Sequence, residues 1–174
     1  MIEQSPINLT IRRTTASDFE AVFAILEEAA TWLQTRGIPQ WSFFLTDPGK
    51  DFVRNRIITA ETYLVFDSAN SPIATFTLQW KDEEIWGQRG LDGKAGYVHG
   101  LAVARRTAGK GLGRILLNEA SNLIAKNSRL LMRLDCMANN EPLCNIYRCA
   151  GFSDLGVDDS NITGKGLRLF ERQI

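Results

Sequence analysis

The chain of 174 residues has little of several features that mark specialised classes of protein. It contains one histidine, three cysteines and five prolines, and its 20 Lys and Arg residues are balanced by 20 Asp and Glu residues. Without a net charge, the chain has no overall electric field that would favour nucleic acid or a membrane surface. We therefore expect no nucleic-acid partner and no membrane partner, and any anionic ligand must be bound by a local arrangement.

Long hydrophobic runs are also absent. No apolar stretch approaches the roughly 20 residues that span a bilayer, and residues 1–6 lack the basic and apolar segments of a signal peptide. Cys136, Cys144 and Cys149 form no C-x-x-C pair, which is typical of reduced thiols. Cys136 lies in an apolar stretch and is expected in the core, and no histidine pairs with the other two. These absences predict a cytoplasmic protein.

The composition is that of an ordinary globular domain. Hydrophobic residues make up 44% of the chain and charged residues 23%. A chain of this length buries a sizeable core without metals or disulfides. No repeat, low-complexity tract or linker divides the sequence, so we expect one domain over residues 1–174.

The order of hydrophobic patterns predicts an α/β fold. Strands outnumber helices, and their long central run favours a mixed sheet with helices on both faces. A helix from about residue 16 begins at a near capping box of Thr15 and Asp18 and ends at Gly37, and Asp47 is the cap candidate of the next helix. Residues 81–94 are expected to form a surface loop. The expected strands are residues 9–13, 62–67, 73–80, 96–103, 130–137, 152–157 and 166–171, and the later helices are residues 48–60, 111–126 and 141–150.

The most informative segment is the glycine-rich turn Ala108-Gly109-Lys110-Gly111-Leu112-Gly113-Arg114, which joins a strand to a strongly amphipathic helix. Glycines let the backbone approach a ligand closely, and the free amides at a helix N-terminus favour an anion. A pyrophosphate fits there, with Lys110 and Arg114 at its rim. The spacing matches neither the P-loop nor the dinucleotide-binding fingerprint, and a turn without a ligand is the alternative.

Two motifs together resemble the GNAT superfamily of N-acyltransferases. Leu101-Ala102-Val103 followed by Gly111 and Gly113 is similar to the family's L-x-V triplet and [QR]-x-x-G-x-[GA] pattern. Residues 140–152 resemble N-x₆-Y-x₃-G-F. Ala108 departs from the pattern, because Gln or Arg is usual there. One side-chain contact to coenzyme A is then lost or is taken over by Lys110, Arg106 or Arg114.

The resemblance implies a largely antiparallel central sheet whose fourth and fifth strands splay apart. It implies transfer of an acetyl group from acetyl-CoA to a primary amine of a small molecule or a protein, directly within a ternary complex and without a metal. Homodimers are common in the family, although nothing in this sequence marks an interface. The implied cofactor-binding residues are Leu101, Ala102, Val103, Gly109, Lys110, Gly111, Leu112, Gly113, Arg114 and Asn140.

Tyr147 is the catalytic residue that the resemblance implies, since a phenol beside the thioester sulfur can protonate the leaving thiolate. A core tyrosine that packs the helix on the sheet is the alternative. Asn140 would hydrogen-bond the pantetheine arm or, alternatively, cap a helix. Backbone amides of residues 101–103, freed by a bulge at Gly100, would pair with pantetheine and polarise the thioester carbonyl.

The general base stays open among His99, Glu84, Asp135 and a relay through water. His99 has no residue of ligand type spaced to join it in a metal site, so none is expected. On the acceptor side, aromatic residues together with the acidic run at 82–84 could hold a cationic amine. Core tryptophans and a solvated hairpin tip are the preferred alternative. The residues concerned are Trp32, Gln40, Trp41, Phe43, Phe44, Trp80 and Trp86.

Two further hypotheses come from other classes of protein. A non-catalytic module that binds acyl-CoA and regulates a partner fits the missing contact at Ala108. A ligand-free interaction domain would leave the glycines and Tyr147 as a coincidence, and it is the least favoured.

Overall fold

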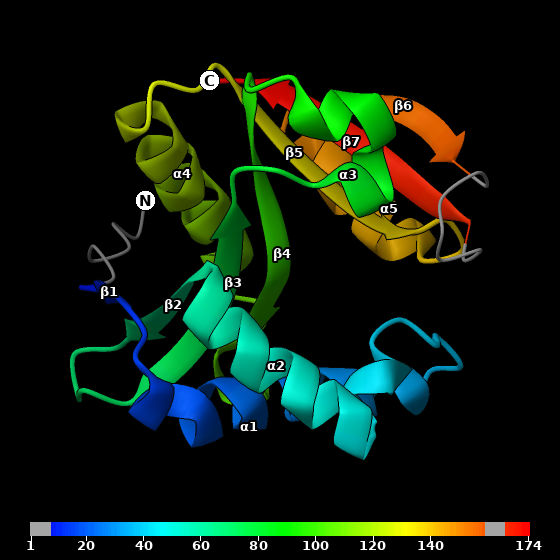
Figure 1. The fold of residues 1–174 in the computed structure, drawn as a ribbon. Coiled ribbons are helices and arrows are strands. Elements are labelled where there is room, and N and C mark those ends of the chain that lie inside the picture. Colours follow the sequence, from blue (N-terminus) through cyan, green and yellow to red (C-terminus); the bar gives the residue numbers. More distant parts are fainter. Residues whose placement is uncertain (1–7, 159–165) are drawn as a thin grey trace, which may run out of the picture.

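The computed structural model describes residues 8–158 and 166–174, so residues 1–6, in which no signal peptide is expected, lie outside it. In this part of the chain seven strands form one sheet in the order β1-β2-β3-β4-β5-β7-β6 (Figure 1). All neighbours are antiparallel except β4 and β5, which are parallel. This confirms the mixed, largely antiparallel sheet. The strands are β1 Thr10–Arg13, β2 Glu61–Phe66, β3 Pro72–Gln79, β4 Ala95–Val103, β5 Leu131–Met137, β6 Ser153–Asp158 and β7 Leu167–Gln173.

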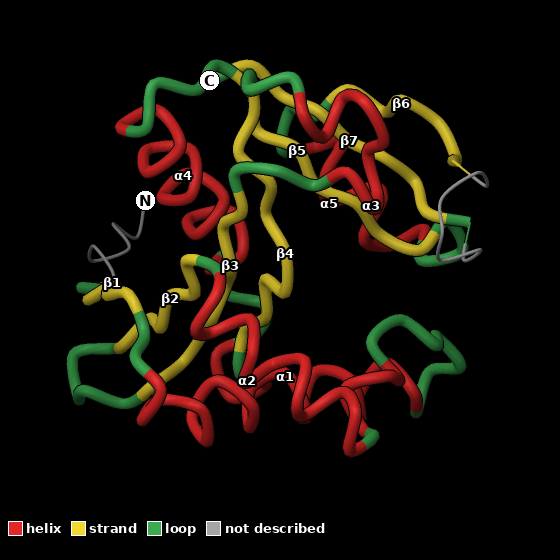
Figure 2. Tube along the Cα trace, in the orientation of Figure 1, coloured by secondary structure: helices red, strands yellow, loops and turns green. Residues whose placement is uncertain are grey.

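Helices cover both faces of the sheet, as expected (Figure 2). The α-helices are α1 Phe19–Gln34, α2 Asp47–Thr59, α3 Glu83–Trp86, α4 Leu112–Lys126 and α5 Glu141–Cys149. Leu64 belongs to the core cluster with α1 and α2, and its neighbour Val65 belongs to the cluster with α4. Because successive strand residues point to opposite faces, α4 lies opposite α1 and α2.

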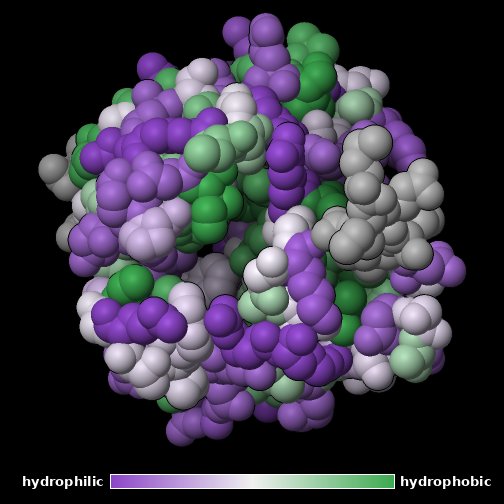
Figure 3. All heavy atoms as spheres, turned by 180° about the vertical axis from the view of Figure 1, so that it is seen from behind, coloured by the Kyte–Doolittle hydropathy of each residue, from purple (hydrophilic) through white to green (hydrophobic). Residues whose placement is uncertain are grey.

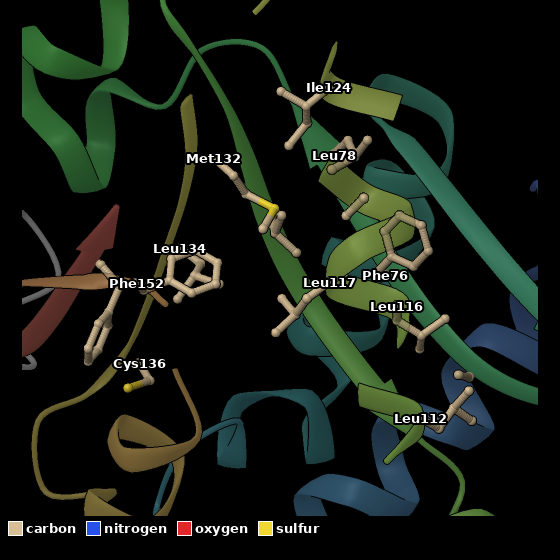
Figure 4. Close-up of a cluster of buried hydrophobic side chains, with 14 of the residues drawn as sticks. Phe76, Leu78, Leu112, Leu116, Leu117, Ile124, Met132, Leu134, Cys136 and Phe152 are labelled. Carbon is tan, nitrogen blue, oxygen red and sulfur yellow. The ribbon is translucent and has the colours of Figure 1, made fainter. Parts of the chain in front are cut away.

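The larger core cluster joins α4 to the strands. Leu112, Leu116, Leu117 and Ile124 on α4 pack with β3 and β5 (Figure 4). Ile124 also sits against Gly96, where an added Cβ would come within 2.5 Å of the isoleucine side chain. This contact places the end of α4 beside the start of β4, so the helix runs back along the strand.

Two local expectations are wrong. The cap of α2 is Thr46 rather than Asp47, because the Thr46 hydroxyl accepts from the Gly49 amide at 3.2 Å and Asp47 lies inside the first turn. Residues 81–94 are not a plain loop, since they contain α3 and a 3-10 helix over Gly87–Leu91. Asp82 caps α3 by accepting from the Ile85 amide at 3.3 Å.

The start of the first helical segment is as predicted. The Thr15 amide donates to the Asp18 carboxylate at 2.8 Å, and Gly37 has a φ of 70° in the turn that follows α1. Within residues 8–158 and 166–174, no helix combines the length and the apolar character needed to cross a membrane.

Candidate active site

β4 and β5 separate halfway along the sheet. Their pairing runs from Ala95 opposite Leu131 to Tyr97 opposite Arg133, and no pair is formed beyond that point. The register between β3 and β4 shifts near Gly100, whose φ is 56°. A bulge at a glycine bends a strand away from its neighbour. The splay of strands four and five is therefore confirmed, and residues 101–103 do not pair with β5.

A small pocket of about 40 Å³ lies where the strands separate, and we call it the splay pocket. Its walls come from the segment after α1, from β4 and β5, and from α4 and α5. Seen from behind, the molecule has a hollow near its centre with hydrophobic residues inside it (Figure 3). The splay pocket is lined by Gln40, Trp41, Val98, His99, Gly100, Leu101, Leu117, Leu134, Asp135 and Tyr147.

The glycine-rich turn leaves its backbone open. Gly109 and Gly111 have φ angles of 78° and 75°, a region that favours glycine, and Gly111 is the N-cap of α4. A Cβ built at Gly109, Gly111 or Gly113 would meet nothing within 4 Å. The amides of Leu112 and Gly113 donate to no other described residue. The turn therefore has the space and the donors that a diphosphate requires.

The side chains of the turn divide into core and rim. Leu112 is buried in the α4 core, so it offers a ligand its backbone alone. Lys110 and Arg114 are exposed and form no ion pair with the described residues. Arg106 already donates to the Pro72 carbonyl at 2.7 Å. Lys110 and Arg114 are thus the cations of this turn that remain available to an anion.

Tyr147 projects from α5 into the splay pocket. Its ring packs edge-on against Phe170 at 5.3 Å and tilted against Phe152 at 5.9 Å. No hydrogen bond joins its hydroxyl to another described residue. Burial raises the pKa of Tyr147, so the hydroxyl stays protonated. The ring of Tyr147 therefore packs in the core, and its hydroxyl is available to donate a hydrogen bond to a ligand.

Asn140 caps α5 and is tied to Gln40. Its side-chain oxygen accepts from the Leu143 amide at 3.4 Å, and its amide nitrogen donates to Gln40 at 2.9 Å. Asn140 is 3% exposed. Capping is thus present, and the predicted contact with pantetheine stays a prediction. Gln40 itself lines the splay pocket.

His99 lies between two carboxylates. Its Nε2 is 3.2 Å from Asp82 Oδ2, and its Nδ1 is 3.7 Å from Asp135 Oδ1. Nε2 and Oδ2 are buried without a hydrogen-bond partner among the described residues. Burial also raises the pKa of Asp135. The expectation that His99 lacks a partner of ligand type is wrong, because distant segments bring both carboxylates to it. The absence of a metal stays a prediction.

A second pocket, of about 340 Å³, opens on the α2 side of His99, and we call it the acidic pocket. Asp82, Glu83 and Glu84 line it at the start of α3, so the acidic run is not a hairpin tip, and Glu83 and Glu84 are exposed to solvent. His99 is the lining residue that the acidic pocket and the splay pocket share. The base candidates His99 and Glu84 therefore lie in one pocket, and Asp135 lies behind His99.

The predicted aromatic residues fall in several places. Trp41 lines the splay pocket and Phe44 lies in the α1–α2 core. Trp32 is half-buried beneath Arg105, whose guanidinium is 3.9 Å from the ring centre, so it is not a core residue. Trp80 and Trp86 do not line the acidic pocket, and a cage built from them is not formed there.

The cysteines are packing residues or surface thiols. Cys136 and Cys144 are buried with their sulfurs 3.5 Å apart, and Cys149 is exposed. All three are free. Burial raises the pKa of Cys136, which disfavours a thiolate nucleophile there.

Parallel strands that separate halfway along the sheet, next to a glycine-rich helix start, are the arrangement that the resemblance to N-acyltransferases implied. The model of the "Acetyltransferase (GNAT) family" matches residues 23–152. The uncharacterized N-acetyltransferase YesJ of Bacillus subtilis strain 168 is 33% identical over 162 residues, which cover 90% of this chain and 86% of YesJ. The chain belongs to the GNAT acetyltransferase family, and the predicted family and enzyme class are confirmed.

Solved structures share the fold. A GNAT-family acetyltransferase from Listeria monocytogenes 4b F2365 has a TM-score of 0.80 at 24% identity, with 99% of each chain covered. The PaiA N-acetyltransferase of Thermoplasma acidophilum, solved in complex with coenzyme A, has a TM-score of 0.71 at 18% identity, with 97% of this chain and 100% of that one covered. At these identities the likeness shows the fold alone.

Proposed function

We propose that the protein is a cytoplasmic N-acetyltransferase that moves an acetyl group from acetyl-CoA to a primary amine within a ternary complex. The observation that carries the proposal is the position of His99, shared by the splay pocket that contains Tyr147 and by the acidic pocket. One pocket suits a thioester and the other suits a cationic acceptor. A homodimer is compatible with this arrangement and stays a prediction.

Acetyl-CoA would lie along the splay and across the start of α4. The open amides of Leu112 and Gly113 would donate to its diphosphate, with Lys110 and Arg114 at the rim. The backbone of residues 101–103 would pair with the pantetheine arm, since β5 leaves that edge free. A carbonyl held by backbone amides is polarised toward attack.

The acceptor amine must lose protons for the reaction to proceed. A lysine-like amine, with a pKa of about 10.4, is almost entirely protonated at neutral pH. We assign proton acceptance to His99, whose Nε2 and the facing Asp82 oxygen are buried and without hydrogen bonds among the described residues. Asp135 lies on the other side of the ring, with its Oδ1 3.7 Å from Nδ1.

Tyr147 completes the transfer. As the amine nitrogen bonds to the acetyl carbon, the carbon–sulfur bond breaks and the sulfur takes the Tyr147 proton. An ammonium acceptor gives up two protons in all. One leaves through His99 to solvent, and the other replaces the proton that Tyr147 donates.

The test is an amine panel with acetyl-CoA, with release of free thiol and the acetylated amine measured together. We expect both products in equal amounts, and no acetylated protein intermediate when acetyl-CoA is added without an amine. Thiol release that does not depend on amine, or stabilisation by coenzyme A without any transfer, would contradict the proposal. The latter result would favour a regulatory acyl-CoA-binding module.

A further inference from the structure

The acidic pocket contains a half-buried cation that acetyl transfer does not require. Arg56 reaches the pocket from α2, beside Asp82, Glu84 and His99. Its Nη2 donates to the Gln79 side-chain oxygen at 3.3 Å, and its guanidinium lies 4.6 Å from the centre of the Phe52 ring. These neutral neighbours orient the guanidinium without balancing its charge.

Arg56 forms no ion pair with any residue that the structure describes. Arg12, Arg133 and Arg148, in contrast, each contact a carboxylate within 3 Å. Burial lowers the pKa of Arg56, and the more distant Asp82, Asp135 and Glu84 oppose that shift. A guanidinium has five N–H donors, and one of them is engaged here. The remaining donors can pair with a carboxylate, which guanidinium binds bidentately.

We propose that Arg56 binds the carboxylate of the acceptor, so that the preferred acceptors are amino carboxylic acids rather than simple amines. The inference rests on the proposed acetyltransferase function and names its substrate class. The ammonium end would face His99 and the Asp82 carboxylate, and the carboxylate end would face Arg56. A pocket of about 340 Å³ is at the small end of the usual range for ligand sites and suits a small acceptor.

The simpler explanation is that Arg56 only offsets the surrounding acidic residues. In that case the guanidinium would be expected to contact one of them, as charged groups in partly buried sites usually do. Here it is turned toward Gln79 and Phe52 instead. The two explanations differ in what they predict for acceptors that lack a carboxylate.

The experiment compares straight-chain ω-amino carboxylic acids of increasing length with the alkylamines that lack the carboxyl group. Both series are assayed for kcat and KM with the wild-type protein, Arg56→Gln, Arg56→Lys and the control Arg54→Gln. Arg54 lies on the same helix, is exposed and pairs with Asp51. Thermal stabilisation by coenzyme A shows that each variant is folded and binds its cosubstrate.

We expect the wild-type protein to prefer the amino acids by roughly 10- to 100-fold in kcat/KM at the best chain length. This is the factor that the free energy of charge-assisted hydrogen bonds corresponds to. Arg56→Gln should remove that preference mainly through KM, Arg56→Lys should restore part of it, and Arg54→Gln should retain it. Equal use of both series, or a preference that survives Arg56→Gln, would overturn the inference and leave the proposed function intact. If no amine is acetylated, both fall together.

Discussion

The hydroxyl of Tyr147 has two properties that a proton donor needs. Phe152 and Phe170 hold the ring, and no described residue accepts from the hydroxyl. Burial raises the pKa of Tyr147, so its proton stays in place throughout the neutral range. A side chain that is fixed by packing and unpaired at its polar end is prepared for a ligand atom.

Replacing Tyr147 by Phe removes the donor and keeps the packing. We expect kcat to fall by roughly 10²- to 10⁴-fold, the usual contribution of a general acid, with coenzyme A affinity changed only a few-fold. Tyr63→Phe is the matched control, since the Tyr63 hydroxyl donates to Glu61 outside both pockets. Turnover of Tyr147→Phe equal to that of the control would show that Tyr147 is structural.

His99 should govern how fast the acceptor amine loses its proton. In His99→Gln we expect a rate at least roughly 100-fold lower, because the variant lacks the group that accepts that proton. Steady-state rates at saturating acetyl-CoA measure the effect. A variant that keeps the wild-type rate would exclude His99 and leave Glu84 or water as the base.

At the scale of elements, a substitution at the start of α4 can change coenzyme A binding without lowering the stability of the fold. Gly113 lies inside α4, outside the left-handed region, and an added Cβ would meet nothing. Gly113→Ala should therefore leave stability unchanged or raise it by about 0.5–1 kcal/mol, because alanine favours a helix over glycine. The added methyl would nevertheless occupy the space predicted for the diphosphate.

We therefore expect Gly113→Ala to weaken coenzyme A binding by roughly tenfold or more, the cost of impairing a charge-assisted hydrogen bond. Asn118→Ala is the control, since Asn118 is an exposed residue of the same helix. Calorimetric titration and urea unfolding measure the two quantities. Normal affinity in Gly113→Ala would place the diphosphate elsewhere.

The pair β6–β7 should lose stability in acid. Burial alone would raise the pKa of Asp154, but hydrogen bonds from Arg148, Gly156 and Arg168 outweigh it and lower the pKa to about 2. The charged carboxylate is favoured by folding, so its contribution is present above the unfolded pKa of about 3.9 and fades as the pH falls toward 2. In Asp154→Asn, urea unfolding should show less loss of stability between pH 4 and pH 2. An unchanged loss would contradict this.

Long elements with a clear period could be predicted from the sequence, and short ones could not. α4 is fifteen residues long with a hydrophobic stripe on one face, and the sequence predicted its start to within one residue. α3 has four residues, too few for a helical period to appear. The separation of β4 from β5 could be predicted only from the family resemblance. Hydrophobic patterns indicate where strands form but not where two neighbouring strands stop pairing.

The same distinction applies to the candidate site: residues within local motifs could be predicted, and contacts between distant segments could not. The glycine-rich turn and Tyr147 lie within local motifs, so the sequence could indicate them. The contact of His99 with Asp82 and Asp135 joins three segments, and the position of Arg56 depends on α2 docking beside α3. The acidic run at 82–84 was visible in the sequence, but its approach to His99 was not, and Arg56 is an ordinary charged residue that no local pattern distinguishes.

At the scale of the whole molecule, the separation of β4 from β5 brings the two pockets next to each other at His99. α4 and the glycine-rich turn lie on one face of the sheet, and α2 lies on the other (Figure 1). The acidic pocket includes residues of α2. His99 lines both pockets. A cosubstrate in the splay pocket and an acceptor in the acidic pocket would therefore both reach His99, and direct transfer requires that the two reactants lie close together.

A crystal structure with bound coenzyme A tests this account most directly. It should show the diphosphate oxygens within hydrogen-bond distance of the Leu112 and Gly113 amides, and the sulfur beside the Tyr147 hydroxyl between β4 and β5. Coenzyme A bound away from the start of α4, or with its sulfur outside the splay pocket, would contradict it.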